Sequence, residues 1–132
     1  MKILIVDDDF SSRKILLKYL SDYGQCDIAV NGKEAVDAFK IAIDEWEAYD
    51  LVCLDIMMPE MDGQQALKEI RQIENEKGKF GTDGAKIIMT TALDDSDNIK
   101  TSFREQCEAY LIKPIIKDKL VQKLESLGFI KT

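Results

Sequence analysis

Histidine is absent from this chain of 132 residues, and cysteine occurs only three times. Cys26, Cys53 and Cys107 are widely spaced and include no CxxC pair. A metal site in this chain would therefore have to use oxygen ligands, without imidazole or paired thiolates. The odd number of scattered cysteines favours buried, reduced thiols over a disulfide framework.

Long apolar runs are also missing. The longest uninterrupted runs are far too short to cross a bilayer, so we expect no membrane partner. The first residues, MKILIVDDD, lack the apolar length and the small-residue cleavage site of a signal peptide. We therefore expect a cytoplasmic protein.

Positive charge is in short supply. The 25 acidic residues outnumber the 18 lysines and arginines, which gives a formal net charge of -7. A nucleic-acid surface needs clustered lysine and arginine to neutralise phosphates, so this balance argues against nucleic acid as a partner. It favours protein partners and metal cations instead.

The length suits one domain covering residues 1–132, with a core of ordinary size. Strand-like and helix-like patterns alternate about five times along the chain. This alternation predicts an α/β fold in which crossover helices cover a parallel sheet. We expect strands near residues 2–6, 26–30, 50–55, 85–91 and 108–112.

Local signals support the helices between these strands. Asn31 followed by Glu34, and Asp62 followed by Gln65, have the spacing of a capping box. Each pair predicts the start of a helix at that point.

The second predicted helix carries an apolar stripe. Its members stand three and four residues apart: Val36, Phe39, Ile43 and Trp46. This spacing is typical of an amphipathic helix lying on a sheet, and we interpret the stripe as core packing.

Reactive polar residues follow four of the apolar runs. These residues are Asp7 and Asp8 after KILIV, Asp55 after LVCL, Thr91 after KIIMT, and Lys113 after AYLI. In a parallel sheet all of them would meet at the carboxyl edge, where open α/β sheets bind ligands. Three carboxylates, a hydroxyl and an ammonium group predict a site for a divalent cation and a phosphoryl group.

Electrostatics favours a metal in this site. Two like charges 4 Å apart at an effective dielectric near 20 repel by about 4 kcal/mol, so three converging carboxylates need a cation. Mg²⁺ prefers a few carboxylates with water and phosphate oxygens. Lys113 and Thr91 would then contact phosphoryl oxygens, and one carboxylate remains as a nucleophile that forms an aspartyl phosphate. Taken singly, these residues also suit ordinary caps, turns and strand ends, and their joint placement is what favours a site.

Four segments carry a resemblance to a known family. In chain order they are LIVDDD, LVCLDIMMPEMDG, IIMTTA and YLIKP. With this order and spacing, the chain resembles response-regulator receiver domains of the stand-alone, CheY-like type. The resemblance spans nearly the whole sequence, and it implies a doubly wound, five-stranded parallel sheet with strand order 2-1-3-4-5.

The resemblance also assigns roles to individual residues. It implies that Asp7 and Asp8 are the acidic pair that binds Mg²⁺ and that Asp55 is the phosphoacceptor. Met57 would lend its backbone carbonyl to the metal. Asp9, the third acid of the run, is expected to be a neighbour of the site rather than a ligand.

Signal output is implied in the same way. Thr91 and Lys113 would contact the phosphoryl group, and Tyr110 would change rotamer between the two states. The output face would comprise the fourth helix, fifth strand and fifth helix, near residues 95–127. A sensor histidine kinase or phosphotransfer protein would donate the phosphoryl group, and the output would be contact with another protein, without an output domain. Such a protein is not an enzyme, because it catalyses only its own phosphorylation and dephosphorylation.

One departure from the family pattern bears on assembly. Receivers that dimerise through the fourth-helix face tend to carry KPF, then an acid and an arginine in the last helix. Here Ile115 replaces the phenylalanine, and Lys119 and Lys123 stand near the other two positions. We therefore expect a monomer, or a weak dimer of another kind, on phosphorylation.

Two rival functions remain open at this point. Asp7, Asp9 and Ser11 fit the DxDx[TS] pattern of haloacid dehalogenase-type phosphatases, with Asp7 as nucleophile. That family also needs an acidic metal motif after the lysine, where this chain offers only Asp118. A flavodoxin-like electron carrier would share the fold, but the phosphate-binding loop after the first strand is missing.

Overall fold

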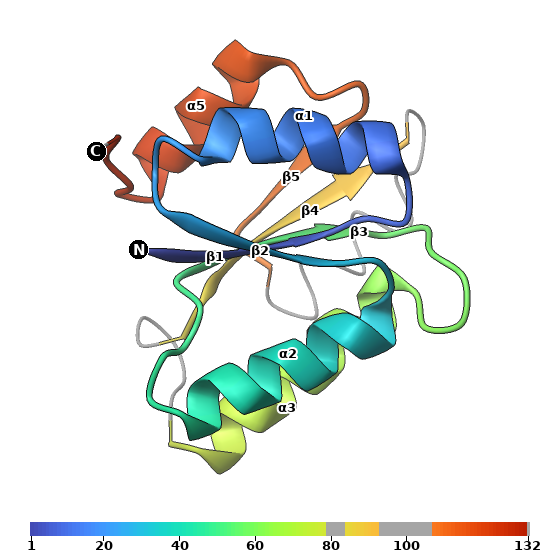
Figure 1. Ribbon diagram of the computed structural model, residues 1–132, viewed down its shortest axis with the longest axis vertical. Helices are drawn as coiled ribbons and strands as arrows, with labels where there is room; N and C mark the ends of the chain where they lie inside the picture. The colour runs from blue at the N-terminus through green and yellow to red at the C-terminus, as the bar shows by residue number, and fades with distance from the viewer. Residues whose placement is uncertain (79–83, 93–106, 132) are drawn as a thin grey trace.

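The computed structural model describes residues 1–78, 84–92 and 107–131 as a three-layer α/β domain (Figure 1). Five parallel strands form one sheet in the order β2-β1-β3-β4-β5. The strands are β1 (Lys2–Val6), β2 (Gln25–Ala29), β3 (Leu51–Asp55), β4 (Lys86–Thr91) and β5 (Ala109–Ile112). The predicted doubly wound sheet is confirmed, and each strand lies within one residue of its predicted range.

Four helices cover the sheet in the described residues. They are α1 (Phe10–Leu20), α2 (Gly32–Asp44), α3 (Gly63–Glu76) and α5 (Lys117–Ser126). Helices α1 and α5 lie on one face, and α2 and α3 lie on the other (Figure 1). Within this part of the chain, no helix combines the length and the apolar character needed to cross a membrane. The predicted fourth helix falls among residues 93–106, outside the described residues.

The central strands are apolar because both of their faces are covered. Every residue of β3 is buried, and alternate residues of β1 enter different cores. Leu4 and Val6 pack toward α2 and α3, while Ile3 and Ile5 pack toward α1 and α5. A single unpatterned apolar run therefore fills two cores, as the twofold alternation of a strand requires.

Both predicted capping positions begin a helix. The Asn31 side chain accepts a hydrogen bond from the Glu34 backbone N–H at 2.8 Å, and the Asp62 side chain accepts one from Gln65 at 2.9 Å. Glu34 in turn accepts from the backbone N–H of Val30 at 3.1 Å, one residue before the cap. These bonds satisfy N–H groups that have no partner within the helix.

The three cysteines are free thiols that differ in their burial. Burial raises the pKa of Cys53 to about 12 and that of Cys107 to about 11. Cys26 is only half-buried, and its pKa is also raised, chiefly by burial. The expectation of buried, reduced thiols is therefore met by Cys53 and Cys107.

The predicted stripe on α2 is wrong at its last position. Phe39 and Ile43 are buried and Val36 is half-buried, but Trp46 is 92% exposed. The helix ends at Asp44, and Trp46 adopts a left-handed φ of 61°. This conformation costs a residue with a Cβ about 1–2 kcal/mol and directs the chain away from the helix axis. The three- and four-residue spacing therefore continues past the end of the helix.

Candidate functional site

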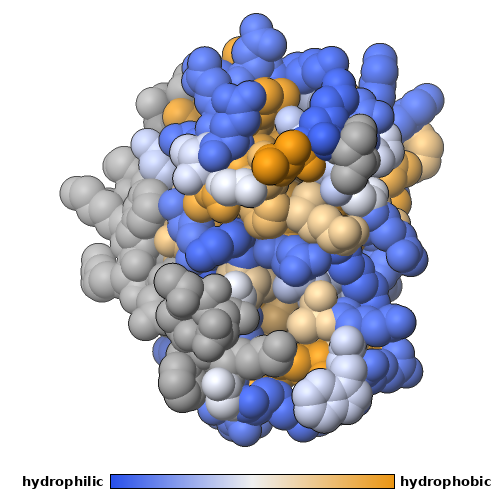
Figure 2. All heavy atoms as spheres, turned by 90° about the vertical axis from the view of Figure 1, so that its left-hand side faces the viewer, coloured by the Kyte–Doolittle hydropathy of each residue, from blue (hydrophilic) through white to orange (hydrophobic). Residues whose placement is uncertain are grey.

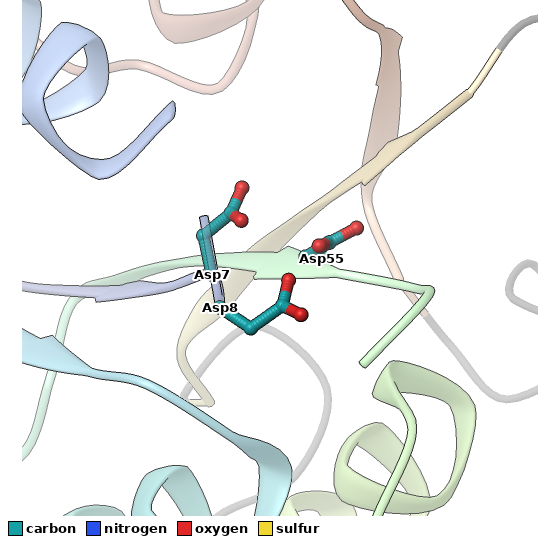
Figure 3. Close-up of side chains that lie close together, drawn as sticks. All are labelled: Asp7, Asp8 and Asp55. Carbon is teal, nitrogen blue, oxygen red and sulfur yellow. The ribbon is translucent and has the colours of Figure 1, made fainter. Parts of the chain in front are cut away.

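The predicted acidic residues meet at the carboxyl edge of the sheet (Figure 3). Asp7 and Asp8 directly follow β1, and Asp55 is the last residue of β3. One carboxylate oxygen from each residue lies within 4.8 Å of the others. Because β1 and β3 are hydrogen-bonded neighbours, the same strand register that buries their apolar residues brings these carboxylates together.

Asp7 is the most enclosed member of the cluster, with no exposed surface. One of its carboxylate oxygens accepts a hydrogen bond from the Asp9 backbone N–H at 2.9 Å. The other lies 2.9 Å from the Lys113 Nζ. The backbone carbonyl of Asp7 accepts a hydrogen bond from the Arg13 guanidinium at 3.0 Å. Arg13 was not predicted from the sequence, and only its place in the first turns of the helix after the acidic run points to such a contact.

Asp55 is almost fully buried and shares Lys113 with Asp7. Its Oδ2 lies 3.2 Å from the Lys113 Nζ, and its Oδ1 accepts a hydrogen bond from the Met57 backbone N–H at 3.3 Å. Burial, followed by the negative charge of Asp7, raises the pKa of Asp55 to about 6, although Lys113 opposes the shift. Burial lowers the pKa of Lys113, but the two carboxylates outweigh burial and raise it overall.

The loop after Asp55 is held close to the strand end by Gly63. Its N–H donates to the Ile56 carbonyl at 2.9 Å, and α3 begins at this residue. A Cβ at Gly63 would collide with the Asp55 backbone carbonyl. Only glycine therefore allows α3 to begin so near the end of β3.

Three further predicted residues lie at or near this edge. Thr91 is buried at the end of β4, and its hydroxyl donates a long hydrogen bond of 3.4 Å to the Ala92 carbonyl. Tyr110 is half-buried in β5 and packs against the core beneath α2 and α3. The side chain of Met57 is 63% exposed. The roles predicted for these residues, including metal binding through the Met57 carbonyl, stay predictions.

Asp9 lies beside the cluster but caps α1. Its side chain accepts hydrogen bonds from the Ser12 backbone N–H at 2.9 Å and from the Ser12 hydroxyl at 3.0 Å. These two bonds, from the backbone first, lower the pKa of Asp9. The DxDx[TS] interpretation requires the Asp9 carboxylate to take part in the chemistry of the site. Because this carboxylate caps α1 instead, the structure argues against that interpretation.

The donor chemistry of the cluster fits Mg²⁺. All three candidate side-chain ligands are carboxylates, and the acidic Asp8 is exposed and open to solvent. With Lys113 included, three negative charges face one positive charge. A hard dication would balance the excess and could retain several waters on the exposed side.

In metal-free protein, we expect Asp55 to reduce stability as the pH rises from about 4 to 7. Its pKa in the folded state, about 6, lies above the ordinary value of 3.8, so the folded state binds this proton more tightly. The stabilisation that protonated Asp55 contributes to the folded state is fully present below pH 3.8 and is lost as the pH rises past about 6. It amounts to at most about 3 kcal/mol.

This effect is measured as the free energy of unfolding in urea, with EDTA present to remove metal, for the wild type and Asp55→Asn at pH 4 to 8. The stability of Asp55→Asn relative to the wild type should increase as the pH rises, because asparagine carries no charge at any pH. Parallel curves for the two proteins would show that Asp55 titrates normally.

Comparison with known proteins gives a family match. The family model described as "Response regulator receiver domain" matches residues 3–125. The probable transcriptional regulator ycf27 of Cyanophora paradoxa is 35% identical over 96% of this chain, and the chain spans 47% of that protein. The chemotaxis protein CheY of Halobacterium salinarum is 31% identical, over 96% of this chain and 95% of that protein. The chain thus spans about half the length of some curated relatives and nearly all of others.

A solved structure agrees with the sequence comparisons. It is a co-crystal structure of the Saccharomyces cerevisiae histidine phosphotransfer signaling protein Ypd1 with the receiver domain of its downstream response regulator Ssk1. Its TM-score is 0.81 at 27% identity, over 97% of this chain and 88% of that one. Both the fold and the order of its elements are therefore shared with a solved receiver domain.

Proposed function

This chain belongs to the response regulator receiver family, and we propose that it accepts a phosphoryl group on Asp55 from a histidine kinase or a phosphotransfer protein. The observation that carries this proposal is the buried Asp55 carboxylate, which contacts Lys113 and lies beside Asp7 and Asp8. The receiver domain of Ssk1 is paired with a histidine phosphotransfer protein, which supports the kind of donor.

The chain's own residues would carry out the transfer. A carboxylate oxygen of Asp55 forms the new O–P bond, the P–N bond of the donor phosphohistidine breaks, and its electron pair returns to the donor imidazole. Asp55 must be ionised to attack, and Lys113 favours that form because it lies 3.2 Å from the carboxylate. Asp7, Asp8 and Asp55 would bind Mg²⁺, with Met57 contributing its carbonyl. The metal would neutralise charge on the transferring oxygens.

Phosphorylation would then act through Lys113. The phosphoryl group adds about 1.5 to 2 negative charges and strong acceptor oxygens, which compete with Asp7 for the Lys113 ammonium. Lys113 directly follows β5, and its backbone N–H donates to the Thr91 carbonyl at 2.7 Å, so a shift in the lysine is transmitted to two strands. We propose that Thr91 and Tyr110 relay this change to a protein-binding face.

Three further properties belong to this proposal. We propose that the protein acts in the cytoplasm, remains a monomer, and catalyses no reaction except on its own phosphoryl group. The haloacid dehalogenase-type alternative finds no support, because Asp9 caps α1 and the family match is to receivers. A phosphatase would release many phosphates per chain, whereas a receiver retains one.

The proposal is tested by incubating the protein with acetyl phosphate and Mg²⁺ and then measuring its intact mass and mapping its peptides. We expect one phosphoryl adduct per chain, confined to Asp55 and absent from Asp55→Asn. Asp118→Asn is the matched control, because Asp118 is an exposed acid in the first turn of α5, and it should be phosphorylated like the wild type. An adduct on Asp7, or continuous phosphate release without an adduct, would contradict the proposal.

A further inference from the structure

The only tryptophan of the chain stands where neither burial nor backbone conformation favours it. Trp46 is 92% exposed and has a φ of 61°. The Trp46 backbone N–H donates to the Ile43 carbonyl at 3.3 Å, and the Glu47 backbone N–H donates to the Ala42 carbonyl at 2.9 Å. These are the hydrogen bonds of a helix end at which the left-handed residue is usually glycine. The large indole therefore contributes little to folding, and its exposed ring faces are available for contact.

A small cavity opens beside the indole. It has a volume of about 170 Å³ and is lined by Ile43, Asp44, Trp46, Ala48 and Lys77. Two of the lining residues, Lys77 and Asp44, form an ion pair of 2.7 Å. Cavities of about 150 Å³ accept benzene, so this one is large enough for a single aliphatic side chain.

The acids near Trp46 in the sequence outnumber the lysines that pair with them, because Asp44, Glu45 and Glu47 face only Lys77 and Lys2. Glu45 is exposed and forms no ion pair with any residue in the described ranges. Glu47 is largely exposed, and it forms an ion pair of 3.6 Å with the Lys2 ammonium. The exposed tryptophan therefore has an acid without an ion pair, Glu45, directly before it in the sequence, and this pair of residues complements a cation that can both stack and form hydrogen bonds.

This surface lies opposite the phosphoacceptor. The end of α2 is at the amino edge of the sheet, on the side of the chain's N-terminus, whereas Asp55 ends β3 at the carboxyl edge (Figure 1). Figure 2 shows the amino-edge side of the molecule, where apolar patches lie among hydrophilic side chains. A ligand bound here would leave the phosphoacceptor accessible.

We propose that Trp46 and the adjoining cavity form a docking site for a basic segment of a partner protein. An arginine of the partner stacks its guanidinium on the indole and pairs with Glu45, and a neighbouring aliphatic side chain enters the cavity. Arginine suits this site better than lysine because its planar group stacks on aromatic rings while donating to carboxylates. Docking at this edge does not depend on phosphorylation of Asp55.

The tripeptide acetyl-Arg-Leu-Arg-amide serves as the probe, and the single indole serves as the reporter. We expect a saturable change in Trp46 fluorescence and in its indole N–H resonance, and a much weaker response to acetyl-Glu-Leu-Glu-amide. The apparent Kd should be in the millimolar range and should weaken at least threefold in Glu45→Gln. It should be unchanged by beryllofluoride, which mimics the phosphoryl group.

Trp46→Gly provides the stronger test, read from the backbone amide resonance of Ala48. Binding should weaken at least tenfold, although the variant should melt at the same or a higher temperature because glycine suits the left-handed conformation. Phe10→Ala is the control, because Phe10 is an aromatic residue 69% exposed at the other edge of the sheet. It should bind the peptide like the wild type.

Four outcomes would overturn the proposal. They are a response that does not saturate, an equal response to the acidic peptide, unchanged binding in Trp46→Gly, and an indole signal that changes with protein concentration alone. The last outcome would identify a second copy of this chain as the occupant.

Discussion

Asp8→Asn should abolish phosphorylation of Asp55 and the stabilisation by Mg²⁺, while raising the melting temperature of the metal-free protein. Asp8 contributes one of three carboxylates whose oxygens lie within 4.8 Å of one another. Removing its charge takes away a metal ligand and also relieves repulsion. Charges 4 Å apart repel by about 4 kcal/mol at an effective dielectric of 20, and the exposure of Asp8 reduces this figure.

Thermal melts with and without Mg²⁺ measure the first effect. At 100 times its Kd, Mg²⁺ should stabilise the wild type by about 2.7 kcal/mol. For a domain of this length that corresponds to a rise of roughly 10 °C. Asp8→Asn should show almost no rise, and its phosphorylation by acetyl phosphate should be undetectable by intact mass.

Asp9→Asn is the matched control, because the two aspartates are adjacent in the sequence but differ in their contacts. Asp9 caps α1, and asparagine caps a helix as well as aspartate does. This variant should keep both the response to Mg²⁺ and phosphorylation. A wild-type response in Asp8→Asn would show that Asp8 is not a ligand, and loss of the response in Asp9→Asn would place Asp9 in the site.

The convergence of this cluster could be predicted from the sequence because it follows from strand direction alone. Asp7, Asp55 and Lys113 each end or follow an apolar run, and parallel strands bring such ends to one edge. The bounds of the strands were predictable for the same reason, since polar residues mark where burial stops. No knowledge of side-chain packing was needed for either result.

Contacts that depend on a local chain reversal or a distant partner could not be predicted. The apolar spacing continues through Trp46 although the helix has ended, because the left-handed turn leaves no mark in that spacing. Arg13 reaches a backbone carbonyl, a group that every residue offers. Glu108 contacts Arg71, which is 37 residues away in the sequence, and neither stands in a recognisable motif.

The Arg71 contacts form a second charged cluster, at the amino edge of the sheet. The Arg71 guanidinium lies 2.7 Å from a Glu74 oxygen and 2.7 Å from a Glu108 oxygen, and it donates to the Ala85 carbonyl at 2.8 Å. Glu74 is 3% exposed and accepts the Ala85 backbone N–H at 2.6 Å. Glu108 accepts the Ile87 N–H at 2.6 Å. One arginine therefore pairs with two acids that fix the starts of β4 and β5.

Arg71→Leu should be among the most destabilising single changes in this protein. Removing one partner of a buried ion pair leaves an uncompensated charge and typically costs about 3–5 kcal/mol. The melting temperature should fall by roughly 10–18 °C. Denaturation measured in urea would give the loss in free energy directly, and phosphorylation well below the melting temperature should persist, because Asp55 lies at the other edge.

Two further variants distinguish the cost of leaving a buried carboxylate unpaired from the cost of losing the arginine side chain itself. Lys77→Ala removes an ion pair of the same length, 2.7 Å, but both of its side chains are nearly half exposed, so it should cost at most about 1 kcal/mol. Arg71→Leu combined with Glu74→Gln should recover part of the loss, because the glutamine oxygen can still accept the Ala85 N–H without leaving a charge. If Arg71→Leu costs no more than Lys77→Ala, the carboxylates of Glu74 and Glu108 do not depend on Arg71 for their stabilisation.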